Sequence, residues 1–296
     1  MEATVFTEIL LPVSLVLIMF GMGMTLTLAD FQRLLITPKT VTVGLVGQLI
    51  GLPLVAFGLA LAFSLEPHIA IGLMILSACP GGTSSNLLSH IARANIALSV
   101  TLTAVTSVIC IITTPWLIRF SIDYFAITPD ETFSLIKTSL SLLVITLIPI
   151  GLGMLVRKFA LNFAVRSENF FKHLSTLFLF SMIAIIAYKE REILWEAFPN
   201  IFMVTLSLNI IATALGILFA KISRLNAQDA LTIGIEVGTQ NATVAILIAV
   251  TFLAKPEYSI AGAVYGVGMY LGAFGLILLR KKSWLGFREK TIENKL

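Results

Sequence analysis

The sequence predicts an all-α polytopic membrane protein with nine transmembrane helices. Of its 296 residues, 57% are hydrophobic and only 12% are charged, whereas soluble domains carry about 25% charged residues. The apolar residues form long stretches, and one helical crossing of a bilayer needs ~20 such residues. No charged insertion of domain size separates these stretches. We therefore expect a single transmembrane domain over residues 1–296.

Nine apolar stretches long enough to cross a membrane follow one another along the chain. They cover residues 5–29, 38–64, 68–92, 95–122, 132–157, 170–190, 198–222, 227–254 and 258–280. Proline lies at or near the start of several of them, as at Pro67, Pro199 and Pro256. A helix leaves its first N–H groups unpaired, so proline costs little there.

The distribution of charge predicts how these spans are oriented. If the N-terminus is outside, most of the 20 Lys and Arg residues fall in inside loops or on the tail that begins at Arg280-Lys281-Lys282. Acidic residues such as Glu66, Asp123 and Glu257 then lie outside. Since basic loops stay on the cytoplasmic side, we expect a multi-pass protein of the cell inner (plasma) membrane. Its N-terminus would be outside and its C-terminus cytoplasmic.

The third span contains a sequence that cannot continue a regular helix. Pro80-Gly81-Gly82 interrupts it, and the next four residues, Thr83-Ser84-Ser85-Asn86, suit the start of a new helix. Irregular backbone at membrane depth persists only inside protein or beside a water-filled cavity. A packed kink would explain the break by itself, but four consecutive polar side chains favour a binding site.

The eighth span holds the one carboxylate that sits well inside an apolar stretch. Glu236 is followed by Gly238, which weakens a helix, and by the carboxamides of Gln240 and Asn241. A charge at this depth costs at least ~3 kcal/mol unless a partner offsets it. We therefore expect a second broken helix, with a ligand beside Glu236.

The two broken spans enter the membrane from opposite sides in the predicted topology. Such a pair is typical of secondary transporters, which are built from inverted repeats and bind their substrates near the membrane midplane. The first four spans would then correspond to the last four, and the fifth would have no counterpart.

The residues around the breaks predict binding of both a cation and an anion. Helix starts attract anions, so Thr83 and Asn241 lie where an anionic substrate would meet backbone amides. Carbonyl, carboxylate and carboxamide oxygens bind hard cations. Oxygen ligands of this kind occur at Gln48, Ser85, Asn86, Ser99, Thr103, Glu236 and Gln240. The many neutral oxygens favour Na⁺, and a proton carried by Glu236 is the alternative.

Several other polar residues in the spans have weaker signals. Thr106 and Ser107 share a helical stripe with Ser99 and Thr103, but hydroxyls on membrane helices can bond back to their own carbonyls. Asn209 is interpreted as a packing carboxamide. The fifth and sixth spans are mostly apolar and are expected to serve as support. The aromatic hydroxyls of the last span, on Tyr265 and Tyr270, could donate to a substrate or simply pack.

An enzyme is not expected. Catalysis at membrane depth would need a nucleophile or a metal cluster. The three histidines, His68, His90 and His173, are scattered near span ends.

Four motifs together resemble the bile acid:sodium symporter family over nearly the whole chain. They are Phe20-Gly21-Met22-Gly23-Met24-Thr25-Leu26, residues 79–86 (CPGGTSSN), residues 92–99 (ARANIALS) and residues 236–241 (EVGTQN). The chain resembles a bacterial-type homologue with nine spans. Several bacterial members carry His-Asn in the last span, where this chain has Met269-Tyr270.

The resemblance implies a core domain and a panel domain, with the broken third and eighth spans crossing in the core. The core would comprise 38–64, 68–92, 95–122, 198–222, 227–254 and 258–280, and the panel 5–29, 132–157 and 170–190. One sodium site would use Ser85, Asn86, Ser99, Thr103 and Glu236. The second would use Gln48, Glu236, Val237, Thr239 and Gln240, partly through backbone carbonyls. Substrate would contact Thr83, Ser84, Asn241, Met269 and Tyr270.

The expected function is therefore sodium-coupled symport of an organic anion by alternating access, with two Na⁺ ions as the coupling ions. A proton-coupled carrier of the same fold, with Glu236 as the proton carrier, is the alternative. The resemblance implies a carboxylate or a sterol conjugate as the anion. The lipid bilayer is the other expected partner. No nucleic acid and no obligate protein partner are expected.

Overall fold

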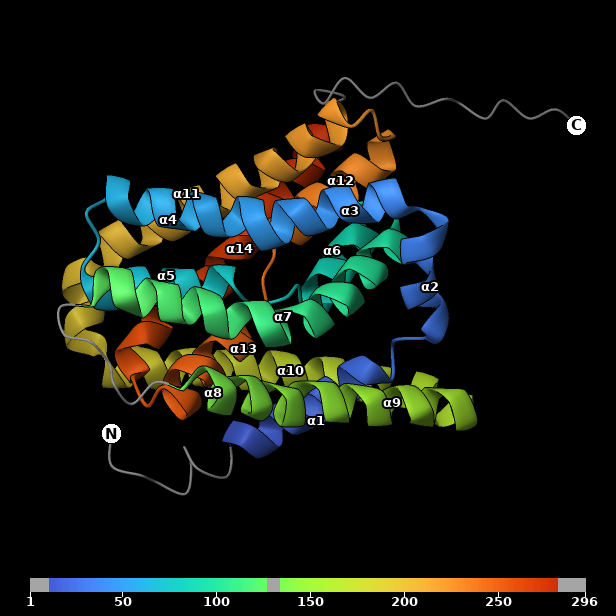
Figure 1. The fold of residues 1–296 in the computed structure, drawn as a ribbon, viewed down its shortest axis with the longest axis horizontal. Helices are drawn as coiled ribbons and strands as arrows, with labels where there is room; N and C mark the ends of the chain where they lie inside the picture. The colour runs from blue at the N-terminus through green and yellow to red at the C-terminus, as the bar shows by residue number, and fades with distance from the viewer. Residues whose placement is uncertain (1–10, 127–133, 282–296) are drawn as a thin grey trace, which may run out of the picture.

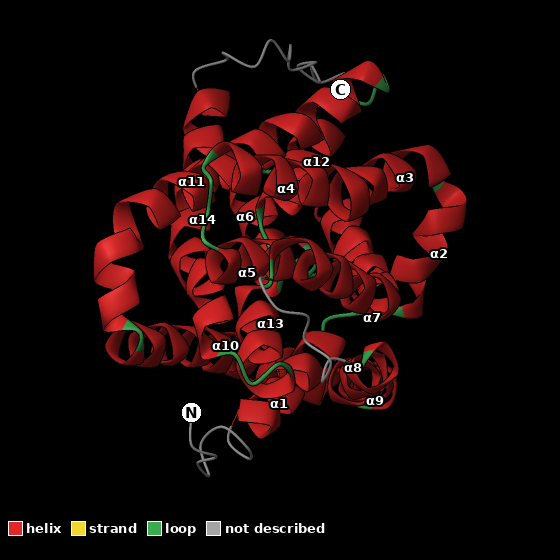
Figure 2. Ribbon diagram, turned by 60° about the vertical axis from the view of Figure 1, so that its left-hand side comes forward, coloured by secondary structure: helices red, strands yellow, loops and turns green. Residues whose placement is uncertain are grey.

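The computed structural model describes residues 11–126 and 134–281, and these residues form helices joined by short turns (Figure 2). The α-helices are α1 (Leu11–Gly23), α2 (Leu28–Ile36), α3 (Pro38–Val46), α4 (Leu52–Ala62), α5 (Pro67–Ser77), α6 (Thr83–Ile91), α7 (Ile96–Phe125), α8 (Leu135–Leu142), α9 (Ile148–Phe159), α10 (Leu161–Lys189), α11 (Arg191–Ile222), α12 (Ala227–Gly238), α13 (Ala242–Leu247) and α14 (Ile260–Lys281). Three π-helical segments, Gly47–Gly51, Leu143–Leu147 and Ile248–Phe252, continue α3, α8 and α13, and a 3₁₀ turn, Pro256–Ser259, precedes α14.

The helices are arranged in layers (Figure 1). The layer with α1, α8, α9 and α10 contains the three spans predicted as the panel, and α1 contacts both α9 and α10. On the opposite side lie α3, α4, α11 and α12, with α5, α6 and α7 between the two layers (Figure 1). Helix α2 connects the layers at one side of the molecule (Figure 1).

Within the described ranges, six helical stretches are long and apolar enough to cross a membrane, or seven if the bent pair α1 and α2 is one span. The predicted third and eighth spans correspond to pairs of shorter helices, α5 with α6 and α12 with α13. The all-helical membrane architecture is therefore confirmed. The count of nine spans stays a prediction, because length and composition alone identify fewer.

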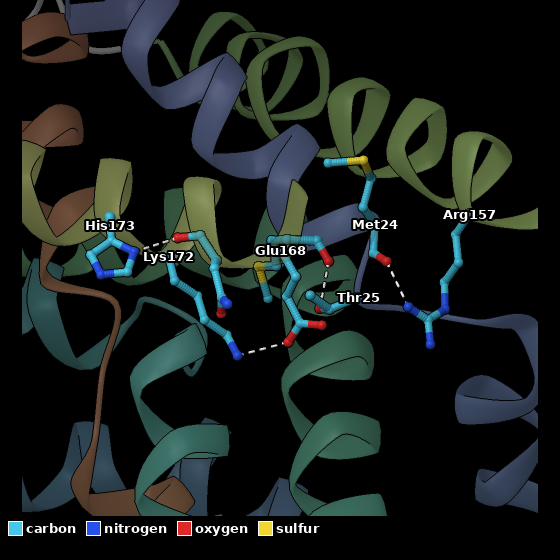
Figure 3. A network of polar contacts seen from close by, with 8 residues as sticks. Met24, Thr25, Arg157, Glu168, Lys172 and His173 are labelled. Carbon is cyan, nitrogen blue, oxygen red and sulfur yellow. Dashed lines mark hydrogen bonds and ion pairs between the residues drawn. The ribbon is translucent and has the colours of Figure 1, made fainter. Parts of the chain in front are cut away.

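Two helices begin before the predicted spans because they continue through charged residues, although the membrane-length part of α11 starts at Ala197, one residue from the predicted start at 198. Helix α10 begins at Leu161 and not near residue 170, and α11 begins at Arg191, which places Pro199 inside it. Hydropathy marked only the apolar part of each helix. The polar first turns of α10 are supported by an ion pair one turn apart, in which Lys172 Nζ lies 2.7 Å from Glu168 Oε1 (Figure 3).

The first predicted span, 5–29, is also corrected at its end. Residues 5–10 lie outside the described residues, and α1 stops at Gly23, where the chain turns by 62° into α2. Arg157 of α9 donates to the Met24 carbonyl at 2.8 Å and so satisfies an end group that the helix itself leaves unpaired (Figure 3). A Cβ on Gly23 would lie 2.1 Å from the Ile150 carbonyl oxygen. The absence of a side chain at Gly23 therefore allows the close approach of α1 and α9.

Within residues 11–126 and 134–281, four turns contain a non-glycine residue in the left-handed conformation: Ser64, Arg93, Arg224 and Ala254. They precede and follow each of the two helix pairs, α5 with α6 and α12 with α13. At the first three, the next amide bonds five residues back, as Leu65 N does to Ala60 O at 3.0 Å. This is the hydrogen bond of a Schellman turn. The turns at Ser64 and Arg224, which precede the two helix pairs, thus have the same hydrogen bond.

The turn between α6 and α7 is fastened to α12 by Asn95. Its Oδ1 accepts from Leu98 N at 3.1 Å and caps α7, while its Nδ2 donates to Asp229 Oδ1 at 2.8 Å. The carboxylate of Asp229 is buried and also accepts from Asn226 Nδ2 at 2.7 Å.

We expect Asn95→Ala to lower the free energy of unfolding by about 2–3 kcal/mol, since it removes a helix cap and leaves a buried carboxylate with one donor fewer. Thermal unfolding in detergent measures the change. Asn169→Ala, at an exposed position of α10, is the control and should change stability by less than about 0.5 kcal/mol. Equal effects of the two substitutions would contradict the stabilising role given to the Asn95 side chain.

The basic tail that begins at Arg280 and is predicted to be cytoplasmic lies mainly outside the described residues. Helix α14 ends at Lys281, and the orientation of the termini stays a prediction.

Candidate functional site

The two interrupted helix pairs meet at their breaks. Residues 78–82 separate α5 from α6, and residues 239–241 separate α12 from α13. Gly81 and Gln240 pair as an isolated antiparallel bridge, and Asn241 N donates to Pro80 O at 3.0 Å. Irregular backbone from two distant parts of the sequence is therefore satisfied by mutual hydrogen bonds, which protects it inside the protein.

The carboxylate of Glu236 lies beside this crossing and is completely buried. Its Oε1 is 2.8 Å from Ser85 Oγ and 2.5 Å from Ser99 Oγ. Thr103 Oγ1 lies 3.1 Å from Oε1 and 3.2 Å from Oε2. Among the described residues no basic side chain forms an ion pair with Glu236. Hydroxyl groups from α6 and α7 are thus its partners, and within the described part of the chain an ionised Glu236 has no protein cation to offset its charge.

Asn86 joins this group through Ser99, whose Oγ lies 2.8 Å from Asn86 Oδ1. All five residues predicted for the first sodium site are therefore gathered within one hydrogen-bonded cluster. Only part of the hydroxyl stripe on α7 contacts Glu236. Thr106 and Ser107 donate to Leu102 O and Thr103 O of their own helix, so these two hydroxyls are structural.

The residues predicted for the second sodium site lie on the other side of the α12 break. Gln240 Nε2 donates to Val237 O at 3.0 Å and to Glu236 O at 3.3 Å. Gln48, on the π-helical segment after α3, donates to Gln240 Oε1 at 3.4 Å. Its own Oε1 is buried without a hydrogen-bond partner, and such a group calls for a ligand or a water. Thr239 is buried at the same break.

Gly81 separates the two oxygen-rich groups. A Cβ added there would lie 2.6 Å from Glu236 Oε2 and 3.4 Å from both Gln48 Nε2 and Thr103 Oγ1. Only glycine leaves this space open. The two predicted ion sites are therefore adjacent, with Glu236 between them.

A pocket adjoins the crossing on the side of α1 and α10. It is lined by Ile18, Met19, Met22, Gly82, Ser84, Ser175, Thr176, Leu179, Gln240, Asn241, Ala242, Thr243, Met269 and Tyr270. Four of the predicted substrate residues are in this lining, and Ser84 Oγ lies 3.0 Å from Tyr270 OH. Thr83 begins α6 at the same break. Met269 is nearly completely buried, so it contributes little surface.

The residues predicted from the sequence to contact substrate at this pocket include none of α1 or α10. Ser175 and Thr176 bring two hydroxyls from a span that was expected only to support the others. The adjacent Ser and Thr in an otherwise apolar segment were the available signal. These two side chains face the pocket because of how α10 packs beside α1. No local sequence pattern predicts that packing.

Comparison with known proteins decides the family. The profile of the Sodium Bile acid symporter family matches residues 12–197. The chain belongs to this family. This confirms the resemblance carried by the four motifs, and it makes the protein a member of a family of membrane transporters.

Relatives within the family are named as sodium-dependent proteins. An uncharacterized sodium-dependent transporter of Bacillus subtilis (strain 168), YocS, is 32% identical over 252 residues, which are 85% of this chain and 76% of the relative. A probable chloroplastic sodium/metabolite cotransporter of rice is 29% identical over 290 residues, 98% of this chain and 67% of the relative. The human ileal sodium/bile acid cotransporter is 27% identical over 249 residues, 80% and 68% of the two chains.

Proposed function

We propose that this symporter-family protein takes up an organic anion together with two Na⁺ ions by alternating access. The observation that carries the proposal is the oxygen cluster around Glu236. Its carboxylate is buried among hydroxyls, with no protein cation as partner in the described part of the chain. A bound cation would offset the cost of burying this charge.

The density of oxygens around Glu236 suits a metal cation. Ser99 Oγ is close to both Asn86 Oδ1 and Glu236 Oε1, and Ser85 Oγ is close to both Gly82 O and Glu236 Oε1. Hydroxyl, carboxamide and carboxylate oxygens gathered in this way are the ligands that hard cations such as Na⁺ prefer.

We place the anionic substrate in the pocket beside the crossing. Its lining residues are hydroxyl, carboxamide, methionine and aliphatic side chains, with no Lys, Arg or His among them. The negative charge would be met by backbone amides where α6 begins and by hydroxyls such as those of Ser84 and Tyr270. The relatives' names, which include metabolites and bile acids, agree with an organic anion.

We also propose the finer architecture that the sequence predicts: nine spans, inverted repeats, a moving panel against a core, and an N-terminus outside the plasma membrane. The left-handed turns support the repeats. Ser64 corresponds to Arg224 and Arg93 to Ala254 if the first four spans match the last four, and all four residues share the same unusual backbone conformation.

Uptake into proteoliposomes tests the proposed function. We expect an inward sodium gradient to drive accumulation of a transported carboxylate, while a pH gradient without sodium does not. The substrate is first found by a thermal-shift screen of organic anions, because a ligand at 100 times its Kd adds about 2.7 kcal/mol of stability. Uptake driven by the pH gradient alone, abolished by Glu236→Gln and indifferent to Na⁺, would establish the proton-coupled alternative instead.

A further inference from the structure

The last carbonyl of α12 is held by two buried side chains outside the proposed ion sites. Gly238 O accepts from Asn209 Nδ2 of α11 at 2.5 Å and from Tyr265 OH of α14 at 2.8 Å. Asn209 is 1% exposed and Tyr265 is 0% exposed. Gly238 is the residue directly before the break, so this carbonyl is one of those that the helix end leaves unpaired.

The neighbouring carbonyls point elsewhere. Val237 O and Glu236 O accept from Gln240 Nε2, on the side of the proposed second sodium site. Gly238 O is engaged by two donors and faces α11 and α14. The Glu236 and Val237 carbonyls, at the same end of α12, face the proposed second sodium site. The rotation of the helix end about its axis is thereby fixed.

Close packing makes this arrangement specific to the residues present. A Cβ on Gly238 would lie 2.0 Å from Thr213 Oγ1 of α11, and a Cβ on Gly272 of α14 would lie 1.7 Å from Asn209 Oδ1. Gly272 therefore opens the space that the Asn209 carboxamide fills. By contrast, a Cβ on Gly275, one turn further along α14, would meet nothing within 4 Å.

We propose that Asn209 and Tyr265 are positioning residues for the sodium site: by holding the Gly238 carbonyl they direct the Glu236 and Val237 carbonyls toward bound sodium. The inference rests on the proposed function and adds two residues to it. Neither side chain contacts the ion or the substrate. Both act through the orientation of the α12 end.

The test measures the sodium concentration that gives half-maximal uptake separately from the KM for the anion at saturating sodium. Tyr265→Phe removes one hydroxyl, and Gly272→Ala displaces the Asn209 carboxamide. Each is expected to raise the half-maximal sodium concentration by about tenfold, the effect of one buried hydrogen bond. The KM for the anion should change by less than about twofold, since neither variant alters the helix start at α6 or a side chain that lines the substrate pocket.

Two matched controls accompany these variants. Gly275→Ala places the same methyl group on the same helix, and Thr205→Val removes a buried hydroxyl of α11 that bonds only to its own helix at Ile201 O and Phe202 O. Both should keep the wild-type sodium dependence. In an Asn209→Ala background, Gly272→Ala should have no further effect, because the shorter side chain leaves room for the methyl group.

A direct readout does not depend on transport. Sodium should raise the melting temperature of purified wild-type protein in detergent, and Tyr265→Phe should need about ten times more sodium for the same rise. If sodium dependence is present in the wild type but unchanged in Tyr265→Phe and Gly272→Ala, this inference is overturned alone. It is also overturned if Gly275→Ala matches Gly272→Ala. A wild type whose uptake and melting are both indifferent to sodium overturns the proposed function and this inference together.

Discussion

Glu236→Ala is expected to reduce sodium-driven uptake by about 100-fold or more, the largest effect of any single substitution in this chain. The carboxylate is the one charged group in the cluster formed with Ser85, Ser99 and Thr103. The neutral oxygens that remain would bind Na⁺ far more weakly, because Coulomb attraction in a buried site is only slightly screened. Uptake of the anion into proteoliposomes under a fixed inward sodium gradient measures the loss.

In contrast to uptake, thermal stability should not fall when Glu236 is replaced by the isosteric Gln. Glu236→Gln keeps the side-chain shape and removes a buried charge that costs free energy when no cation is bound. In sodium-free buffer its melting temperature should equal or exceed that of the wild type, and added sodium should no longer raise it. Glu168→Gln, at the Glu168–Lys172 pair of α10, is the control and should keep the sodium response. A Glu236→Gln protein that sodium still stabilises would contradict the assignment.

Gly81→Ala is expected to weaken sodium dependence by about ten- to a hundredfold, although it adds only a methyl group. The new Cβ would lie 2.6 Å from Glu236 Oε2, closer than van der Waals contact allows. The carboxylate is held by three hydroxyls, so it cannot move away without losing hydrogen bonds to Ser85, Ser99 or Thr103. The sodium concentration for half-maximal uptake measures the effect.

Gly82→Ala is the matched control for this substitution. Its Cβ would meet the nearest atoms, those of Asn241, at 3.6 Å or more, which is ordinary contact distance. It should leave the sodium dependence within about twofold of the wild type, because it displaces no ligand. Equal effects of Gly81→Ala and Gly82→Ala would show that the loop conformation, and not the space beside the carboxylate, controls sodium binding.

The sequence by itself determined the membrane class, the two interruptions and the residues that gather there. A bilayer makes each buried polar group costly, so Glu236 and the polar run 83–86 stood out against their apolar surroundings. Their predicted neighbours followed because the breaks and the carboxylate require partners. Family membership, carried by the same motifs, was confirmed by comparison.

Helix ends and the choice among similar side chains were decided only by the tertiary structure. Hydropathy could not show that α10 and α11 extend through charged turns, since exposed charges do not interrupt a helix. Ser99 and Ser107 look alike in sequence, but one faces Glu236 and the other bonds to its own helix.

The same limit applies to Ser175, Thr176 and Asn209, whose partners depend on how the helices pack. Ser175 and Thr176 line the pocket because α10 packs beside α1, and Asn209 reaches Gly238 because glycines let α11, α12 and α14 approach closely. Polar residues and helix breaks within a membrane span can be predicted from the sequence. The partner of each polar group cannot, because it depends on contacts between helices that are far apart in the chain.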